Sequence, residues 1–329
     1  MAGEAKVLCM GNAIVDIIAR VDDAFLEKHD RTKGAMMLVD APTSATIYDD
    51  MPPAVERSGG SAGNTAAGIA SFGGSAGYIG KVHDDQLGTV FRHDIRAAGV
   101  TFETTPALDG EPTATSMILV TPDAQRTMNT HLGACTEISE ADVVDAEIAA
   151  ADILYVEGYL WDTAPMKAAV VKAMDLAIMH GTKVSLTLSD SFCVDRFRDE
   201  FLALVKSKVD ILFANEAEIT ALFQVATFEE AVAMLRPHIR VAALTRGANG
   251  SVIFSKDEEV AVGAFPAEVE DTTGAGDLYA AGVLYGLSVQ HDMETCAKLG
   301  GLAAAEVISH LGARAEVSLQ ELAAEKLGL

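Results

Sequence analysis

The sequence predicts an α/β protein with a mainly parallel sheet that is flanked by helices on both faces. Short β-rich runs recur along the chain, and the segments between them have the three- and four-residue spacing of amphipathic helices. Half of the 329 residues are hydrophobic, which is enough for a substantial core. We find no internal repeat and no clear linker, so we expect the chain, 1–329, to form a single domain.

Six apolar runs of strand length are expected to form the main sheet. They are KVLCMGNA, SAGYIGKV, DILYVEG, KVSLTLS, DILFAN and VAALTRG. The segment 162–181 has apolar residues three and four positions apart and ends in Gly181, as helices often do. Strands that alternate with helices imply βαβ units, in which neighbouring strands run parallel.

Two stretches break this alternation. Residues 34–40, GAMMLVD, and 113–130, TATSMILVTPDAQRTMNT, look like strands with no helix between them, which predicts antiparallel pairs. We therefore expect a small, discontinuous β-sheet, built from approximately 14–50 and 105–131, that lies over the main sheet as a lid.

The charge and the cysteines limit the class of protein. The chain has 24 Lys and Arg against 48 Asp and Glu, a formal net charge of −24, which argues against nucleic acid or an anionic membrane as a partner. The four cysteines are scattered and form no CxxC pair. This pattern offers neither a zinc framework nor a disulfide scaffold and favours a reducing cytoplasm.

Neither a signal peptide nor a transmembrane helix is expected. The apolar run near the N-terminus lacks a basic region before it and reads as a first strand. Residues 58–80 carry no charge, but eight of them are glycines. Such a run is typical of turns and helix starts and not of a helix that spans a bilayer.

Two common nucleotide-binding motifs are absent. Gly274, Ala275 and Gly276 are not followed by the third glycine of G-x-G-x-x-G, so a Rossmann fingerprint is excluded. Gly80 and Lys81 are followed by valine, where a Walker A loop requires Ser or Thr.

The segment DTTGAGD, residues 271–277, directly precedes an apolar, alanine-rich helix. Its glycines let a ligand approach the backbone closely, and the free amides and dipole of a helix start bind an anion without a lysine. In such a site Asp277 would accept the proton of an attacking hydroxyl group beside a phosphoryl group. The alternative is an ordinary helix start, in which Asp277 only stabilises the N-terminus.

A second glycine-rich element, SGGSAGNTAAGIASFGG (58–74), opens another helix of small residues. Together with DTTGAGD, it resembles the two signature regions of the PfkB, or ribokinase-like, carbohydrate and nucleoside kinases. The resemblance spans nearly the whole chain and includes GNAIVD, NEAE (215–218), TRGANGS (245–251) and the final AAAEVISHLGA. It implies a ribokinase-like fold and an ATP-dependent kinase that acts on a hydroxyl group of a small molecule.

The resemblance also implies roles for residues on the acceptor side. Asp277 corresponds to the catalytic base, and the anion hole is formed by the amides of Gly274, Ala275 and Gly276. The residues implied to hold the acceptor are Asn12, Asp16, Gly60, Ser61 and Asn64. Carboxylates and carboxamides suit this task, because vicinal hydroxyl groups both donate and accept hydrogen bonds.

Two further elements are implied to hold the nucleotide. Glu218 resembles the residue that orients Mg²⁺ through water, with Asn215 beside it. Thr245, Gly247 and Gly250 resemble the turn that holds the phosphates and ribose of ATP. Without the resemblance, Glu218 would be read as a solvated helix acid and the turn as a simple hairpin.

Three residues are implied to supply or bind a cation near the phosphate. Arg126 lies in the second lid strand, from which related kinases bring a cation onto the transferring phosphate; the alternative is a surface arginine. Asp271 and Thr273 match positions that bind a monovalent cation, such as K⁺, in many relatives. The family includes homodimers formed through the lid, so both a monomer and a homodimer are open.

The acceptor class is suggested by the spacing N-x-x-x-D of Asn12 and Asp16, with Ser61 directly after Gly60. This arrangement resembles the adenosine kinases of the family more than its ribokinases or fructokinases. The resemblance therefore implies transfer of the γ-phosphate of ATP to the 5′-hydroxyl of a purine nucleoside, most simply adenosine to AMP, as in purine salvage.

A purine also requires a flat apolar slot. Tyr159 is the candidate for stacking on the base, and Trp161 is a second one, although each can instead be a core aromatic. The lid segments carry no aromatic cluster, so inosine, guanosine or a simple sugar stay open as acceptors, as does a nucleoside-sensing protein on the same fold.

Overall fold

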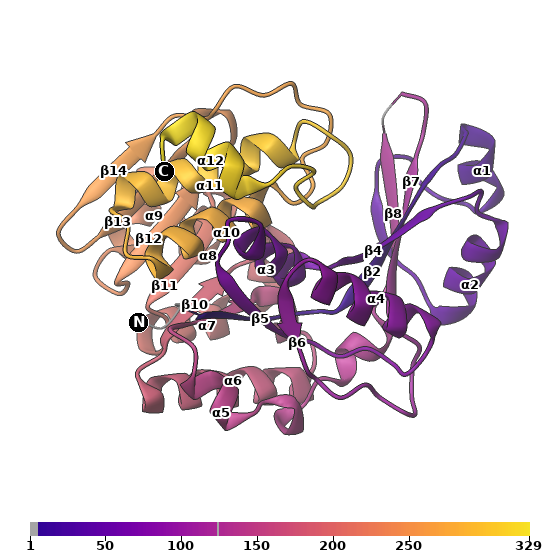
Figure 1. Ribbon diagram of the computed structural model, residues 1–329, viewed down its shortest axis with the longest axis horizontal. Coiled ribbons are helices and arrows are strands. Elements are labelled where there is room, and N and C mark those ends of the chain that lie inside the picture. Colours follow the sequence, from indigo (N-terminus) through magenta and orange to yellow (C-terminus); the bar gives the residue numbers. More distant parts are fainter. Residues whose placement is uncertain (1–5, 124) are drawn as a thin grey trace.

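The computed structural model describes residues 6–123 and 125–329 (Figure 1). The predicted domain, 1–329, and the second lid segment, 105–131, also include residues 1–5 and 124, which lie outside this part of the chain. The described residues form a nine-stranded sheet and a five-stranded sheet. Figure 1 shows the smaller sheet projecting to the right of the large helix-covered one. The predicted α/β class, with a second, smaller sheet, is confirmed.

The large sheet has the strand order β14-β13-β12-β11-β10-β9-β1-β5-β6. Neighbouring strands run parallel from β6 to β12, and β13 and β14 are added antiparallel at one edge. The six predicted strands are confirmed as β1, β5, β9, β10, β11 and β12. The strand bounds are β1 Lys6–Met10, β5 Ser75–Ile79, β6 Val100–Phe102, β9 Ile153–Glu157, β10 Lys183–Thr187, β11 Ile211–Asn215, β12 Val241–Thr245, β13 Ser251–Ser255 and β14 Glu259–Val262.

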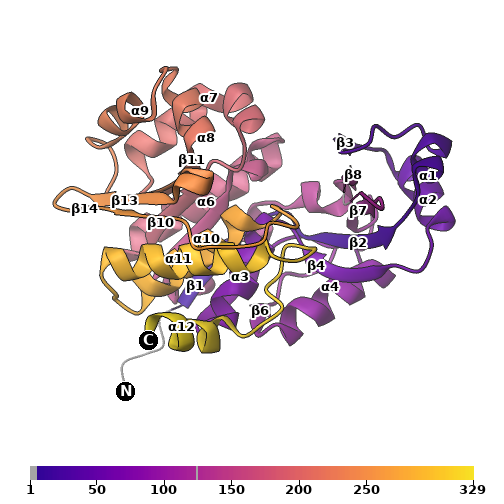
Figure 2. The ribbon, with the colours of Figure 1, turned by 90° about the horizontal axis from the view of Figure 1, so that it is seen from above.

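The central strands are apolar because both faces of the sheet are covered. In β1, Leu8 and Met10 face one layer of helices, whereas Val7 and Cys9 face the other. The first layer contains α6 Ala164–His180, α7 Ser191–Ser207, α8 Glu216–Phe223 and α9 Phe228–Leu235. The second contains α3 Ser61–Ser71, α4 Gln86–Ala97, α10 Ala275–Ser288 and α11 Met293–Val307. Figure 2 shows these two layers on opposite sides of the sheet.

Shorter helices complete the large unit. They are α5 Asp145–Ala149, α12 Leu319–Leu327 and the 3₁₀ turns η1 Gly133–Glu137, η2 Glu140–Asp142, η3 Gly158–Trp161 and η4 Gly247–Asn249. The helix predicted in 162–181 is confirmed as α6. Thr163 caps its start, and Gly181 ends it in the left-handed conformation (φ 80°) that glycine adopts without steric cost.

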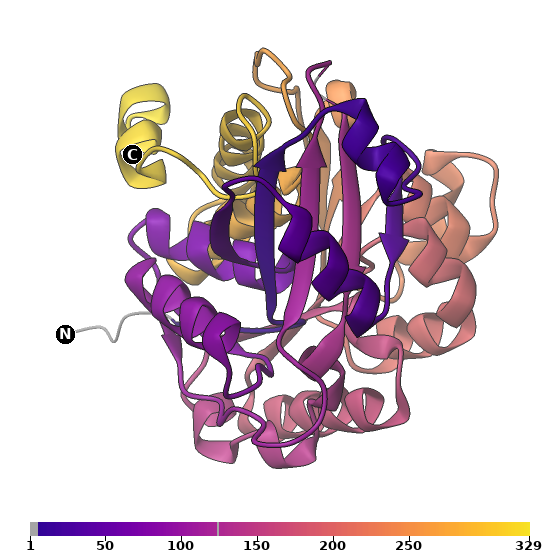
Figure 3. The same cartoon turned by 90° about the vertical axis from the view of Figure 1, so that its right-hand side faces the viewer.

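The second sheet has the order β3-β8-β7-β2-β4. Its strands are β2 Ile14–Arg20, β3 Met36–Leu38, β4 Val55–Gly59, β7 Ala114–Val120 and β8 Arg126–His131. The helices α1 Asp23–Lys28 and α2 Ala41–Asp50 cover its outer face, where Leu26 and Ile47 are buried in one cluster with Val15 and Ile17. Figure 3 looks onto this face, with both indigo helices in front of the strands.

The predicted pairing of the second sheet is correct only in part. β7 and β8 form an antiparallel hairpin, as expected. However, β3 runs parallel to β8, and β2 runs parallel to β7. In addition, β4 joins the sheet from outside the expected range 14–50. These partners lie far apart in the sequence, so local patterns contain no information on their direction.

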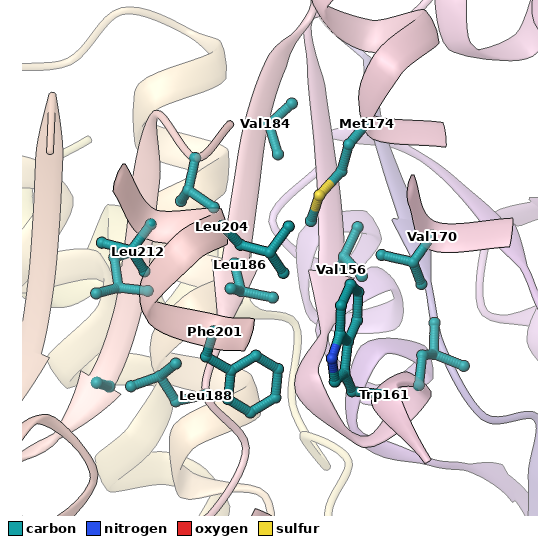
Figure 4. Close-up of a cluster of buried hydrophobic side chains, with 14 of the residues drawn as sticks. Val156, Trp161, Val170, Met174, Val184, Leu186, Leu188, Phe201, Leu204 and Leu212 are labelled. Carbon is teal, nitrogen blue, oxygen red and sulfur yellow. The ribbon is translucent and has the colours of Figure 1, made fainter. Parts of the chain in front are cut away.

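The core between the large sheet and α6 and α7 is continuous. Val156, Leu186 and Leu212 project from three strands against Trp161 and Phe201 (Figure 4). The uncharged run 58–80 forms the end of β4, α3 and β5 and so is a turn, helix and strand, as expected. Among the described residues, no helix has the length and apolar character needed to cross a membrane.

We predict that Phe201→Ala lowers the free energy of unfolding by about 3–5 kcal/mol, because a fully buried ring leaves a cavity. Phe192→Ala on the same helix is the matched control, since that ring is 68% exposed. It should change stability by about 0.5 kcal/mol or less. Urea denaturation of both variants tests this, and equal losses would contradict the described packing of α7.

Candidate active site

The helices α3 and α10 lie side by side (Figure 2). Their starts meet near the carboxyl end of β9, where Glu157 accepts the N–H of Ala62 and Ser61 donates to Asp277. The two helices pack closely, since a Cβ atom at Gly68 would lie 2.6 Å from the Cβ of Ala281. Gly60 precedes α3 with φ +83°, and a Cβ there would lie 2.1 Å from the carbonyl oxygen of Asn12. Gly274 precedes α10 with φ +76°. Both positions therefore require glycine.

Asp277 lies between these two helix starts. Its Oδ1 accepts a hydrogen bond from Ser61 Oγ (2.6 Å), and its Oδ2 accepts one from Asn64 Nδ2 (2.9 Å). Burial raises the pKa of Asp277 above its ordinary value, and these two hydrogen bonds counteract part of the increase. The structure thus brings together three of the predicted residues, Asp277, Ser61 and Asn64, and fixes the orientation of the carboxylate.

Arg314, which follows α11, extends this network and was not predicted. Its Nε donates to Asn64 Oδ1 (2.9 Å), and its Nη2 donates to the carbonyl (2.7 Å) and Oγ (3.0 Å) of Ser58. Ser58 in turn donates to Asp94 of α4 through its N–H (2.8 Å) and Oγ (2.6 Å). No local sequence pattern around Arg314 indicates these contacts.

A first cavity of about 210 Å³ opens beside Ser61, between the large unit and the second sheet. Near Asp277 its wall is polar and is formed by Asn12, Ser61 and Glu157. Further polar or charged residues in the lining are Thr130, Thr136, Asp162, Asp190 and Arg196. The other walls are mainly apolar and aromatic and come from both sheets and from α6 and α7; they include Ile14, Met36, Leu38, Leu132, Tyr159, Met166, Phe192 and Phe197.

Glu157, at the end of β9, organises the polar wall. Its carboxylate accepts the N–H groups of Asn12 (2.8 Å) and Ala62 (2.8 Å) and so joins the β1–β2 connection to the start of α3. Burial raises its pKa to about 7, although these hydrogen bonds act against the increase. Within the described part of the chain, the Oδ1 atom of Asn12 is buried and lacks a hydrogen-bond partner, so it can accept a ligand donor. An acid at the carboxyl end of a buried strand was a usable signal for Glu157.

The aromatic residues divide between cavity and core. Tyr159 lines the first cavity and is 38% exposed. Trp161 is instead buried, donates to Glu200 Oε2 (2.8 Å) and packs against Phe201, so it is a core residue. Phe192, at the start of α7, faces the same cavity as Tyr159 and was not predicted.

Asp16 lies on β2, and its carboxylate lies against Gly59. A Cβ atom on residue 59 would be 2.2 Å from the Oδ2 atom of Asp16. Burial raises the pKa of Asp16 to about 7; the charge of Arg314 lowers it and that of Asp277 raises it. The charge of Asp277 therefore acts on the carboxyl group of Asp16, which is consistent with one shared site.

A second cavity, of about 540 Å³, lies on the other side of the start of α10. The predicted nucleotide residues Thr245, Gly247 and Gly250 line it together with Ala275 and Gly276 of the glycine-rich segment. Gly276 is exposed, with open space where a Cβ would stand. Asp277 thus lies between a helix start that faces the first cavity and one that faces the second.

Asn215 and Glu218 form a reciprocal cap at the start of α8. Glu218 accepts Asn215 N–H (3.0 Å) and Nδ2 (2.6 Å), and Asn215 Oδ1 accepts Glu218 N–H (2.9 Å). Burial raises the pKa of Glu218 to about 7. Asn215 is in register with Thr245, so the cap lies beside the second cavity. Both carboxylate oxygens keep further acceptor capacity, which fits a magnesium ion held through water.

Arg126 connects the second sheet to the glycine-rich segment. Its guanidinium forms an ion pair with Asp271 and donates to Thr273 Oγ1. The Asp271 carboxylate also accepts the N–H groups of Thr273 (2.6 Å) and Gly312 (2.9 Å). A potassium ion here would compete with three protein donors and would be repelled by the guanidinium. This donor set does not fit the expected K⁺ site, and we derive no role for K⁺.

A carboxylate at helix starts that suit an anion, with a cavity beside each start, is an arrangement compatible with phosphoryl transfer. Residues 4–320 match the family described as pfkB family carbohydrate kinase, and the chain belongs to this family. It is therefore a kinase that phosphorylates a hydroxyl group, and the ribokinase-like fold predicted from the sequence is confirmed.

Three similar proteins illustrate the range of the family. A solved adenosine kinase from Sinorhizobium meliloti is 52% identical, covers 98% of this chain and 99% of its own, and superposes with a TM-score of 0.90. A solved probable sugar kinase from Rhizobium etli CFN 42 is 51% identical, covers 99% of both chains and has a TM-score of 0.90. The 5-dehydro-2-deoxygluconokinase of Bacillus subtilis (strain 168) is 32% identical over 277 residues, which are 80% of this chain and 85% of that protein.

We predict that Glu157 makes stability pH-dependent. Because its pKa rises from 4.5 to about 7 on folding, the folded state binds the proton more tightly, and the stabilisation declines as the pH rises through this window. Between about pH 5 and about pH 8, the unfolding free energy of the wild type should fall relative to Glu157→Gln by on the order of 2 kcal/mol.

Urea denaturation at both pH values tests this prediction. Glu258→Gln, which replaces an exposed glutamate in the β13–β14 turn, is the control and should follow the wild type at both values. A difference between wild type and Glu157→Gln that does not change with pH would contradict the assigned burial of the carboxyl group.

Proposed function

We propose that the protein transfers the γ-phosphate of ATP to the 5′-hydroxyl of a purine nucleoside, most simply adenosine to AMP in purine salvage. The observation that carries the proposal is that the first cavity has a polar wall beside Asp277, whereas the rest of its lining is mainly apolar and aromatic and carries a few charged residues such as Asp190 and Arg196. A ribose would fill the polar part, and a purine base would fill the rest. A simple sugar has no flat apolar surface for the second part.

The aromatic walls suit a base from two sides. Tyr159 and Phe192 come from separate elements of the large unit and line the same cavity. Met36 and Leu38 of β3 are 55% and 64% exposed and line it from the second sheet. Exposed apolar side chains around a cavity favour an apolar ligand group.

One row of side chains across the second sheet also changes from polar to apolar. Asp16 is in register with Ser116, Ser116 with Thr130, and Thr130 with Leu38. Because residues in register on neighbouring strands point to the same face, the row runs from a carboxylate through two hydroxyl groups to an aliphatic side chain. Hydroxyl groups of a ribose would match the first part of the row and the base the last.

The comparisons support two acceptor classes. The similarity to the adenosine kinase of S. meliloti favours a nucleoside. The relative from B. subtilis, named for a sugar derivative, favours the alternative of a PfkB sugar kinase with a ribose- or fructose-type acceptor. The aromatic walls of the first cavity favour the nucleoside, with inosine and guanosine as further candidates.

In the proposed reaction, the acceptor hydroxyl lies beside Asp277 and ATP fills the second cavity. The hydroxyl oxygen forms a bond to the γ-phosphorus, the bond from phosphorus to the ADP oxygen breaks, and Asp277 takes the hydroxyl proton. The amides of Gly274 and Gly276 and the α10 dipole stabilise the developing charge. The expected contribution of Ala275 is not kept, because its N–H donates to the carbonyl of Thr272 (3.3 Å). Magnesium, held through water by Glu218, would neutralise the phosphates.

The second sheet would act as a lid that excludes water during transfer. From its position beside Thr273, the Arg126 guanidinium would reach a phosphate bound at the start of α10. We further propose that the protein is a monomer, because α1 and α2 cover the outer face of the second sheet. Four buried, unpaired cysteines favour the reducing cytoplasm.

We predict that the protein forms ADP from Mg·ATP when adenosine is the acceptor, with saturation kinetics, and that it forms none with ribose or fructose.

Asp277→Asn should lower kcat about 10²–10⁴-fold and leave nucleotide binding largely unchanged, because only the proton acceptor is lost. A coupled assay with adenosine, inosine, guanosine, ribose and fructose measures both effects.

Turnover with a sugar alone would replace the proposed acceptor and keep Asp277 as the base. Wild-type rates in Asp277→Asn would refute the base assignment. Nucleoside binding by calorimetry without any turnover would favour the sensing alternative.

We predict that turnover is the same in K⁺ and Na⁺, because Arg126 already neutralises Asp271.

Arg126→Ala should lower kcat more than it raises the KM for the acceptor, since the guanidinium acts on the transferring phosphate. Steady-state kinetics in chloride salts of both ions measure this. A wild-type requirement for K⁺, or an effect of Arg126→Ala confined to KM, would contradict it.

A further inference from the structure

We propose that Arg314 is a positioning residue of the phosphoryl transfer: it fixes the side-chain amide of Asn64 so that an N–H group, and not the carbonyl oxygen, faces the Asp277 carboxylate. This inference rests on the proposed function, since it concerns the same catalytic base. Arg314 follows α11 and is 250 residues from Asn64 in the sequence, so only the fold brings the two together.

The hydrogen-bonding chemistry of the three groups allows one arrangement. A guanidinium only donates, and an ionised carboxylate only accepts, whereas a carboxamide has one end of each kind. Arg314 Nε occupies the oxygen of Asn64 (2.9 Å), so the amide nitrogen must face Asp277 Oδ2 (2.9 Å). If Asn64 rotated by half a turn, oxygen would face oxygen at Asp277 and the ionised base would be destabilised.

The guanidinium is itself fixed by the backbone. Its Nη2 donates to the carbonyl of Ser58 at 2.7 Å, and the Oγ and N–H of Ser58 bond Asp94 at 2.6 and 2.8 Å. The end of β4 and the helix α4 therefore hold Arg314 in place. Asn64 is buried, with 4% exposure, so its amide has little contact with water that could replace this bond.

The charges around the two groups act in the same direction. Arg314 is surrounded by Asp16 on β2, Tyr78 on β5, Asp94 on α4 and Asp277 on α10. Burial raises the pKa of Asp277, whereas the hydrogen bond from Asn64 and the charge of Arg314 both lower it. Loss of the Arg314 charge and loss of the Asn64 orientation should therefore both raise the pKa of Asp277 and disfavour the form that accepts a proton.

The reverse side of Arg314 borders a surface hollow. Its lining includes Arg57, Ser71, Asp94, Arg314 and Glu316, of which Glu316 is exposed. A small guanidinium compound can therefore enter from solvent and replace the missing group in a truncated variant. Rescue by such a compound would show that the guanidinium acts by its position, because a variant that is only less stable would not be rescued.

The test compares Arg314→Met and Arg314→Lys with Arg92→Met, a control at another arginine, in the hollow lined by Thr89, His93 and Arg96. In Arg314→Met, the acidic limb of the kcat/KM profile for adenosine should move up by about one pH unit, with about tenfold less turnover on that limb. Millimolar ethylguanidinium should restore part of the corresponding loss in Arg314→Ala, in which the truncated side chain leaves room for it, and should change neither the wild type nor Arg92→Met.

A second measurement does not depend on the acceptor. The ¹³C carboxyl shift of Asp277, assigned by its absence in Asp277→Asn, is titrated in all variants without substrate. We expect an upward pKa shift in Arg314→Met and a smaller one in Arg314→Lys, which keeps the charge but not the planar set of donors. If Arg314→Met does not fold, Arg314→Lys decides by the same titration.

An Asp277 titration unchanged by both substitutions would overturn the inference. So would a loss of turnover that is equal at all pH values and is not restored by ethylguanidinium, since it would show a purely structural role. If the wild type phosphorylates no nucleoside, the proposed function fails, and the ¹³C titration still decides whether Arg314 positions the carboxylate.

Discussion

The close contact between α3 and α10 is the constraint on which the site depends. Gly68 leaves no room for a side chain against Ala281, and on the far side of α10 Gly282 packs directly on the backbone of Leu299 and Gly300 in α11. The two helix starts therefore lie close enough for Ser61 and Asn64 to bond Asp277. Larger residues at these positions would separate the starts and break the network before any catalytic residue was changed.

This geometry also explains how a strongly acidic protein can bind phosphate. The net charge of −24 repels anions at long range, but the two helix starts supply partial positive charge and free amides at one point. Burial raises the pKa values of Asp16, Glu157 and Asp277, and the charge of Asp277 raises those of Asp16 and Glu157 further. The charge of Arg314 lowers the pKa values of Asp16 and Asp277. These buried carboxyl groups can thus form hydrogen bonds with the hydroxyl groups of a ligand and can accept a proton.

Much of this was predictable because it is local. Six strands of the large sheet follow from apolar runs, and both glycine-rich helix starts follow from composition. The contacts that complete the site are non-local. Arg314, Phe192 and the ion pair of Arg126 with Asp271 join segments far apart in the sequence, and no periodicity encodes them. The direction of β3 depends on the same kind of long-range pairing. The expected K⁺ site could not be judged from the sequence for the same reason, because the guanidinium that competes for Asp271 comes from β8.

A crystal structure with adenosine and a non-hydrolysable ATP analogue would show directly whether the acceptor and ATP occupy the two cavities. We expect the 5′-oxygen within hydrogen-bond distance of Asp277, about 2.6–3.2 Å, with the purine against Tyr159 and Phe192 and the triphosphate along the start of α10. Adenosine bound with another atom at Asp277, or outside the first cavity, would contradict this expectation.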